Sequence, residues 1–257
     1  MNKAKINVLI ILLLICIAHI AITKNIDYNF IFIISLIGLV YIQLYPKEII
    51  EENIKQIETL IPLYSKLEIK KKLPFTQGYA ASPDFLYLIV EIINKNKPQL
   101  VLEAGSGVST VISSYALKKY SNGKIYSLDH DKKYLDNTKK EIINHNLNDY
   151  SKIIYAPLKK YKDGNIWYDT EKINNIDNID FFIIDGPPIK FSKNIRYLAI
   201  PLLFKKMKKG SIIILDDAKR IEEKNIVALW RKEFDCFDFR YVNNSKGAYI
   251  IEKINNY

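Results

Sequence analysis

The chain has 257 residues, 49% of them hydrophobic, which allows one α/β domain plus a short extra element and excludes an intrinsically disordered chain. Its two cysteines, Cys16 and Cys236, are too few for a disulfide framework or a cysteine zinc site, and they favour a reducing compartment. The formal net charge of +10 comes from scattered lysines, so it predicts a solvated surface and no nucleic-acid partner.

Two apolar runs occupy the first part of the chain. Residues 6–22 are interrupted only by Asn7 and His19, and residues 30–45 contain no charged side chain. Each run is slightly shorter than the roughly 20 residues that a spanning helix needs, but flanking polar side chains can reach the interface. The pattern predicts a membrane anchor over residues 1–46, formed by a transmembrane helical hairpin with spans at about 6–22 and 30–45.

The lysines around these runs predict the orientation of the hairpin. Lys3 and Lys5 precede the first run and Lys47 follows the second, whereas the turn contains only Lys24. The positive-inside rule then places both termini and the following domain on the cytoplasmic side of the membrane. A cleaved signal peptide is disfavoured by the poor cleavage site after Ala18, and a pair of buried soluble helices by the absence of a polar face.

Residues 47–81 are expected to form a connecting amphipathic helix and a linker. Pro46 is expected to close the second span, and Pro62 to break the helix that follows. Ser82, Pro83 and Asp84 are typical of a helix start and open a domain that is expected to cover residues 82–257.

Beyond that first helix, strand-like and helix-like segments alternate, which predicts a parallel sheet with helices on both faces. The last two strand-like runs are joined by a turn too short for a crossover helix, so they are expected to form an antiparallel hairpin. The expected strands are 100–103, 124–129, 152–156, 180–185, 211–216, 237–242 and 248–253, and the expected helices are 109–120, 132–146, 192–208 and 221–234.

The first strand ends in a glycine-containing loop before a helix. Gly105 and Gly107 allow the backbone to approach a ligand closely. A dinucleotide-binding fingerprint would require glycine at position 110, where the chain has Thr110. Glu103 would repel a pyrophosphate, and it suits a cationic ligand such as the amino group or the sulfonium of S-adenosylmethionine.

The later strands also end in acids. Asp129 follows the second strand and can accept hydrogen bonds from ribose hydroxyls, because Asp131 is the better cap for the next helix. Asp185 follows the fourth strand, and Asp216 and Asp217 follow the fifth. Three converging carboxylates need a cation, a proton or a substrate amine to offset their repulsion, and a divalent cation such as magnesium is one solution. The alternative is that Asp216 or Asp217 only caps the following helix.

The sequence resembles a class I S-adenosylmethionine-dependent methyltransferase, and in particular the methyltransferase 24 family, over residues 82–253. The resemblance implies a Rossmann-like seven-stranded mixed sheet of order 3-2-1-4-5-7-6. It also implies that the cofactor is bound near the residues that match the family motifs: Glu103, Gly105, Ser106, Gly107, Ser109, Asp129, Ala156 and Asp185. The motifs that carry the resemblance are 102–110, 126–131, 155–158, 167–169, 185–188, 196–197 and 215–218.

Catechol O-methyltransferase-like enzymes hold a metal on acids after strands four and five, which implies Asp185, Asp216 and Asp217 as metal ligands. The chain has Asp217 where an asparagine is usual, so metal dependence stays open. Without a metal, Asp185 or Asp216 is expected to act as general base toward an acceptor hydroxyl.

These features predict a membrane-anchored methyltransferase that methylates a hydroxyl of a sugar, glycan or lipid-linked acceptor. A non-catalytic binding or regulatory module at the membrane is the alternative. A nucleic-acid base methyltransferase is disfavoured, because Asp185-Gly186-Pro187-Pro188 is followed by Ile189 and not by tyrosine. The sequence makes no prediction about the oligomeric state.

Overall fold

The computed structural model describes residues 3–25, 27–76, 80–162 and 164–255. The chain divides into two compact units, residues 1–57 and 58–257. The first unit is helical, and the second is an α/β domain that contains the candidate site.

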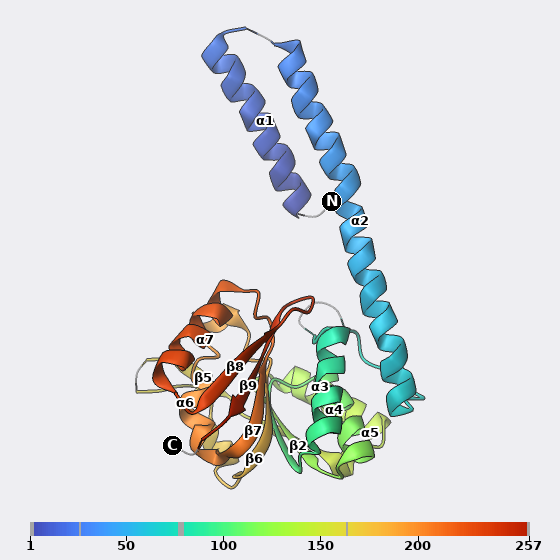
Figure 1. The fold of residues 1–257 in the computed structure, drawn as a ribbon, viewed down its shortest axis with the longest axis vertical. Coiled ribbons are helices and arrows are strands. Elements are labelled where there is room, and N and C mark those ends of the chain that lie inside the picture. The colour runs from blue at the N-terminus through green and yellow to red at the C-terminus, as the bar shows by residue number, and fades with distance from the viewer. Residues whose placement is uncertain (1–2, 26, 77–79, 163, 256–257) are drawn as a thin grey trace. The chain divides into compact units, whose positions relative to one another are not determined.

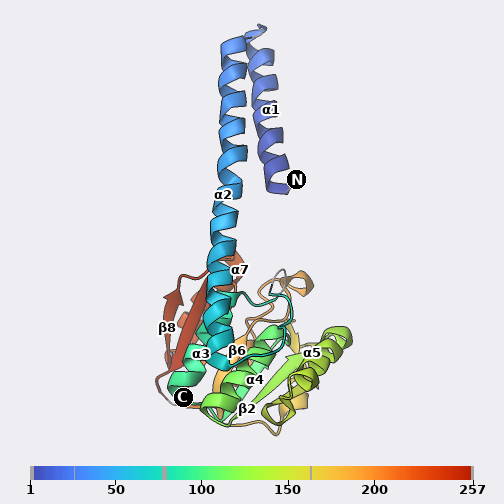
Figure 2. The ribbon, with the colours of Figure 1, turned by 90° about the vertical axis from the view of Figure 1, so that its right-hand side faces the viewer.

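The first unit is a hairpin of α1 (Lys3–Thr23) and the first part of α2 (Tyr28–Leu67) (Figures 1 and 2). Near the turn, the rings of His19 and Phe30 stack with their centroids 4.0 Å apart. Gly38 lies against Leu12, because a Cβ atom on the glycine would be 3.3 Å from Leu12 Cδ1. The two helices therefore form where the two apolar runs predict helices.

The transmembrane part of this prediction is not supported. Within the part of the chain that the structure describes, no helix is both long enough and apolar enough to cross a membrane. The predicted transmembrane spans at about 6–22 and 30–45 therefore have no support from the described helices. The second run also does not form a helix of its own, because α2 continues into a charged segment.

The helix α2 continues through both prolines that were expected to end or break it. A proline inside a helix costs about 3 kcal/mol, mainly through one lost hydrogen bond and a steric clash. Leu63 and Leu67 follow Pro62, are 0% and 4% exposed, and belong to the hydrophobic core of the α/β domain. Burial of two leucines contributes about 3–6 kcal/mol, which is enough to offset the cost of Pro62.

The α/β domain contains a seven-stranded sheet with the order β3-β2-β1-β6-β7-β9-β8. Without the separate two-stranded sheet β4-β5, this order is the predicted 3-2-1-4-5-7-6. β9 is antiparallel to both β7 and β8, as the short final turn predicts. The strands are β1 (Leu100–Ala104), β2 (Lys124–Asp129), β3 (Ser151–Tyr155), β6 (Ile179–Ile184), β7 (Met207–Leu215), β8 (Phe237–Val242) and β9 (Ala248–Lys253).

Helices cover both faces of this sheet (Figure 1). One face carries α3 (Pro83–Asn96), α4 (Val108–Tyr120) and α5 (Lys132–Asn144), and the other carries α6 (Ala199–Leu203) and α7 (Ile221–Glu233). Successive residues of β6 point to opposite faces, so Phe181 and Ile183 enter one core and Phe182 and Ile184 enter the other. The four residues Phe181 to Ile184 are all apolar, and such a run in a central strand is typical of a sheet buried on both faces.

One predicted helix is largely absent. Residues 192–208 are expected to form a single helix, but the segment contains only the five-residue α6, followed by a short 3-10 turn at Phe204–Lys206. β7 already begins at Met207. The apolar spacing of this segment reflects burial of Ile195, Leu198 and Ala199 in an irregular path. The small antiparallel pair β4 (Leu158–Lys160) and β5 (Ile166–Tyr168) was also not expected.

Trp230→Ala tests the packing of α7 on the sheet. Trp230 is 0% exposed, and its indole N–H donates to the Tyr197 carbonyl oxygen at 2.9 Å. The substitution should lower the free energy of unfolding by about 3–5 kcal/mol, because it leaves a cavity and an unpaired carbonyl. Urea unfolding of the full-length chain measures the loss. The neighbouring Leu229 is 38% exposed, so Leu229→Ala should cost less than about 1.5 kcal/mol, and equal losses would contradict this account.

Candidate functional site

The parallel register brings four strand ends to one edge of the sheet. Ala104 at the end of β1 pairs with Leu128 of β2 and with Ile184 of β6, and Ile184 pairs with Leu215 of β7. The acids that follow these positions therefore meet at one level. In open α/β sheets, ligands bind at this carboxyl edge.

A cavity of about 960 Å³ opens here. The cavity is lined by the loop after β1, the end of β2, the loop after β6, α5, and residues 72–75 and 80–81 before α3. Of the predicted site residues, Gly105, Ser106, Gly107, Ser109, Asp129 and Asp185 line the cavity. Other lining residues include Lys72, Phe75, Ala81, His130, Tyr134, Thr138, Lys140, Tyr168, Pro188 and Lys190.

The glycine loop allows two strand ends to approach each other. Gly105 has φ 104°, and a Cβ atom on it would lie 3.3 Å from the backbone nitrogen of Gly186. Glycine is therefore required here for both its backbone conformation and its lack of a side chain. α4 begins directly after Gly107, which places the amides of the helix N-terminus beside the cavity.

Glu103 lies below this loop and is completely buried. Its Oε2 accepts hydrogen bonds from the hydroxyls of Thr110 (2.6 Å) and Ser127 (2.5 Å). Among the described residues its Oε1 has no hydrogen-bond partner. Burial raises the pKa of Glu103 to about 7, although the neighbouring hydroxyls lower it. Thr110 thus supports the acid, which explains why a hydroxyl residue replaces the glycine of a dinucleotide-binding loop.

Asp129 ends β2 and is also buried. Its Oδ2 accepts a hydrogen bond from the Ser106 hydroxyl at 2.5 Å, and its Oδ1 accepts one from the Asp131 amide at 2.9 Å. Burial raises the pKa of Asp129. Asp131 caps α5 by accepting a hydrogen bond from the Lys133 amide at 2.8 Å. The prediction that Asp131 is the cap of this helix is therefore confirmed.

An aromatic wall completes this part of the cavity. Tyr168 is 1% exposed, and its hydroxyl would be 2.5 Å from a Cβ atom on Gly186, so this tyrosine also requires a glycine there. His130 packs edge to face on Phe191, and burial lowers its pKa, which keeps the imidazole neutral. Ala156 does not line the cavity; it is buried behind Asp129, whose carbonyl oxygen accepts from the Ala156 amide at 2.8 Å.

The three acids predicted as metal ligands form a cluster. One carboxylate oxygen each from Asp185, Asp216 and Asp217 lies within 4.8 Å of the others. Asp185 faces the cavity, whereas Asp216 is 0% exposed, and neither oxygen of Asp216 has a hydrogen-bond partner among the described residues. Burial raises the pKa of Asp185 to about 7 and raises that of Asp216 strongly.

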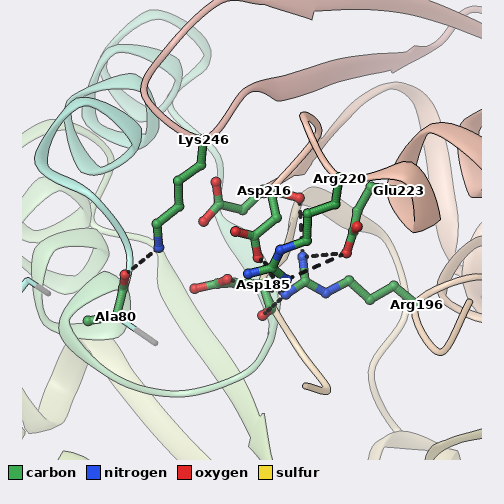
Figure 3. Close-up of polar contacts among 8 residues, drawn as sticks. Ala80, Asp185, Arg196, Asp216, Arg220, Glu223 and Lys246 are labelled. Carbon is green, nitrogen blue, oxygen red and sulfur yellow. Dashed lines mark hydrogen bonds and ion pairs between the residues drawn. The ribbon is translucent and has the colours of Figure 1, made fainter. Parts of the chain in front are cut away.

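Two arginines enter this cluster, and sequence reasoning assigned neither of them a role. The guanidinium of Arg196 donates to the backbone oxygens of Asp185 (2.6 Å) and Asp216 (3.1 Å), as Figure 3 shows. It also donates to Asp217 Oδ2 at 3.0 Å, and Arg220 Nη1 lies 2.8 Å from the same oxygen. Arg196 belongs to one of the motifs that carry the family resemblance, which was the available signal.

This donor set does not fit a divalent cation. Asp217 Oδ2 is already paired with two guanidinium groups, and Arg196 Nη2 lies 3.7 Å from Asp185 Oδ1. A metal bound to these oxygens would lie next to a fixed positive charge.

The fold, the glycine loop and the strand-end acids together define a class I S-adenosylmethionine-dependent methyltransferase domain. Residues 102–218 match a family described as "Methyltransferase domain". A curated relative, ribosomal RNA small subunit methyltransferase A from Mesoplasma florum, is 28% identical over 119 residues, which are 46% of this chain and 43% of that protein. The match thus spans less than half of the relative.

Solved structures show the same fold. An O-methyltransferase from Bacillus cereus in complex with S-adenosylhomocysteine has a TM-score of 0.54 at 18% identity, over 77% of this chain and 90% of that one. The O-methyltransferase TomG from Streptomyces achromogenes, in complex with S-adenosylmethionine, has a TM-score of 0.55 at 9% identity, over 78% and 90%. Together with the family match over residues 102–218, this shared fold confirms the prediction of a class I methyltransferase domain.

Cofactor affinity should depend on pH through Glu103. The predicted role of Glu103 is to pair its ionised carboxylate with the positive amino group of S-adenosylmethionine, and the pKa of Glu103 is about 7. As pH falls below 7, the carboxyl group takes up a proton and loses that pairing, so affinity should fall roughly five- to tenfold between pH 7.5 and pH 6. Calorimetric titration of the full-length chain measures this. Glu103→Gln should bind more weakly with a flatter pH profile, and an unchanged profile would assign the dependence to another group.

Proposed function

We propose that the chain transfers a methyl group from S-adenosylmethionine to a hydroxyl group of a small acceptor. The observation that carries this proposal is that Asp129 and Asp185 line one cavity, together with the glycine loop. Its volume of about 960 Å³ lies at the upper end of the range for small-molecule sites, about 300–1,000 Å³. The cavity therefore has room for an acceptor beside the cofactor.

The geometry of the loop and the strand ends supports the proposed cofactor roles. Glu103 and the loop Gly105–Gly107 would hold the methionine part, since Glu103 keeps one buried oxygen without a partner. Asp129 would accept the ribose hydroxyls, with Ser106 orienting its carboxylate. Ser109 lies in the first turn of α4 and lines the cavity. Ala156 would act through the backbone beside Asp129, and Tyr168 would form a wall.

When bound, S-adenosylmethionine supplies an electrophilic methyl group. The task of the chain is to align the acceptor oxygen with the methyl carbon and to take the proton from the hydroxyl. As the new O–C bond forms, the C–S bond breaks, and the proton moves to a carboxylate. Asp185 suits this role best because it faces the cavity. Asp216 lies behind it and is fully buried, so its catalytic role stays a prediction. Magnesium has no part in this proposal.

A sugar or glycan hydroxyl is within the proposed acceptor class. A lipid-linked acceptor was favoured only by the predicted membrane anchor, so it has no support from the described helices. The location of the domain on the cytoplasmic side of a membrane stays a prediction. The partial match to a ribosomal RNA methyltransferase does not shift the proposal to nucleic acid, because the loop after β6 lacks the tyrosine typical of base methylation.

Asp129→Ala tests cofactor binding. Two charge-assisted hydrogen bonds to the ribose would be lost, so affinity for S-adenosylmethionine should fall roughly 10- to 100-fold. Calorimetry on the full-length chain measures this, with Asp136→Ala on the exposed side of α5 as the matched control. If the folded wild-type chain bound no S-adenosylmethionine, the proposal would fail, and a non-catalytic module would be the better reading.

Asp185→Asn tests the proton acceptor. Transfer of labelled methyl groups to a panel of hydroxyl compounds, including sugars and phenols, should fall about 10²- to 10⁴-fold, because the amide cannot take the proton. Asp235→Asn, an exposed position, is the control. Unchanged transfer by a folded Asp185→Asn chain would exclude Asp185 as the base.

A further inference from the structure

A single buried guanidinium group connects the two strand ends that carry the acidic cluster. Arg196 precedes α6, is 2% exposed, and donates to the backbone oxygens of both Asp185 and Asp216. We propose that Arg196 takes the place of a divalent cation in this site: it positions Asp185 and closes the cluster to metal ions. This inference rests on the proposed function for the role of Asp185, but the exclusion of metals is a property of the apo chain.

The first step of the argument concerns position. The carbonyls that accept from Arg196 belong to the same residues whose carboxylates form the cluster. β6 and β7 are neighbours, with Ile184 paired to Leu215 immediately before these residues. The guanidinium bridges the ends of the two strands, just where their backbone pairing stops. It therefore holds the backbone from which the Asp185 side chain projects into the cavity.

The second step concerns charge. The same Nη2 atom lies 3.0 Å from Asp217 Oδ2 and 3.7 Å from Asp185 Oδ1, and Nη1 lies 3.4 Å from Glu223 Oε1. A guanidinium stays protonated at any ordinary pH, so this positive charge is permanent. It is also enclosed, and it cannot swing into solvent to make room for a metal. A divalent ion that bound the three aspartates would have to bind beside it.

The third step concerns balance. Four acidic side chains meet here, those of Asp185, Asp216, Asp217 and Glu223. The cations Arg196 and Arg220 contact three of them, Asp185, Asp217 and Glu223. Lys246, in the β8–β9 turn, donates to the Ala80 carbonyl oxygen at 2.9 Å (Figure 3). Burial raises the pKa of both Asp185 and Asp216, and the charge of Lys246 offsets part of that increase. Three cations thus offset four carboxylates, which removes most of the need for a metal.

The geometry also explains why the residue is arginine. One planar group donates in two directions to two carbonyls and, through the same fork, to a carboxylate. A lysine ammonium is a compact point charge and cannot span these three acceptors. Arg196 therefore combines the positioning role of a metal with its charge.

The test is a titration of the full-length chain with Mn²⁺, in which electron paramagnetic resonance measures the bound ion. Wild type should show no saturable binding up to about 1 mM, the weak end of protein carboxylate sites. Arg196→Gln should gain saturable binding at least about tenfold tighter, because three carboxylates lose their fixed cation. Arg231→Gln, which removes an exposed guanidinium, should behave like wild type. Tight Mn²⁺ binding by wild type that Asp216→Asn abolishes would overturn the proposal, as would a folded Arg196→Gln chain that gains none.

Arg220→Gln provides a second route if Arg196→Gln does not fold. Arg220 has a side chain that is 38% exposed and pairs with the same Asp217 oxygen. Its removal should produce saturable Mn²⁺ binding that is weaker than that of Arg196→Gln. The absence of saturable binding would count against the proposal. Arg196→Lys separates position from charge: it should still exclude Mn²⁺ while methyl transfer falls. S-adenosylmethionine titration of the same samples reports on the proposed function separately, since wild type can exclude Mn²⁺ whether or not it binds the cofactor.

Discussion

Parallel pairing of β1, β2, β6 and β7 forces several carboxylates to one edge of a sheet that is buried on both faces. Glu103 lies next to the end of β1, Asp129 ends β2, and Asp185 and Asp216 follow β6 and β7. Removing charged groups from water is costly, and bringing like charges together adds to the cost. Each acid must therefore find hydrogen bonds, a cation or a proton. The rest of the site is built around this requirement.

The chain meets the requirement in two different ways. Around Glu103 and Asp129 the partners are neutral, namely the hydroxyls of Thr110, Ser127 and Ser106. Neutral partners leave the negative charge available for a cationic, hydroxyl-bearing ligand. Around Asp217 the partners are guanidinium groups, which cancel the charge within the protein itself. In the proposed function, the part of this edge around Glu103 and Asp129 would bind the cationic cofactor, and the part around Asp217, where guanidinium groups already cancel the charge, would face the acceptor.

Local patterns failed where tertiary contacts were stronger. The segment 192–208 has helical spacing but follows an irregular path that delivers Arg196 to the strand ends. α2 passes Pro62 because Leu63 and Leu67 are buried beyond it. In both places the free energy of burial and pairing exceeds the local preference of the backbone.

The sequence by itself determined the alternation of strands and helices, the final antiparallel hairpin, the glycine loop and the acids at the strand ends. These features depend on side-chain periodicity, turn length and residues adjacent to strands, all of which are local. Only the tertiary structure decided that Arg196 and Arg220 meet Asp217, that Asp185 faces the cavity while Asp216 is buried, and that α2 is continuous. Those outcomes depend on where segments distant along the chain meet in space, and no spacing along the chain encodes the reach of a guanidinium group across two strands.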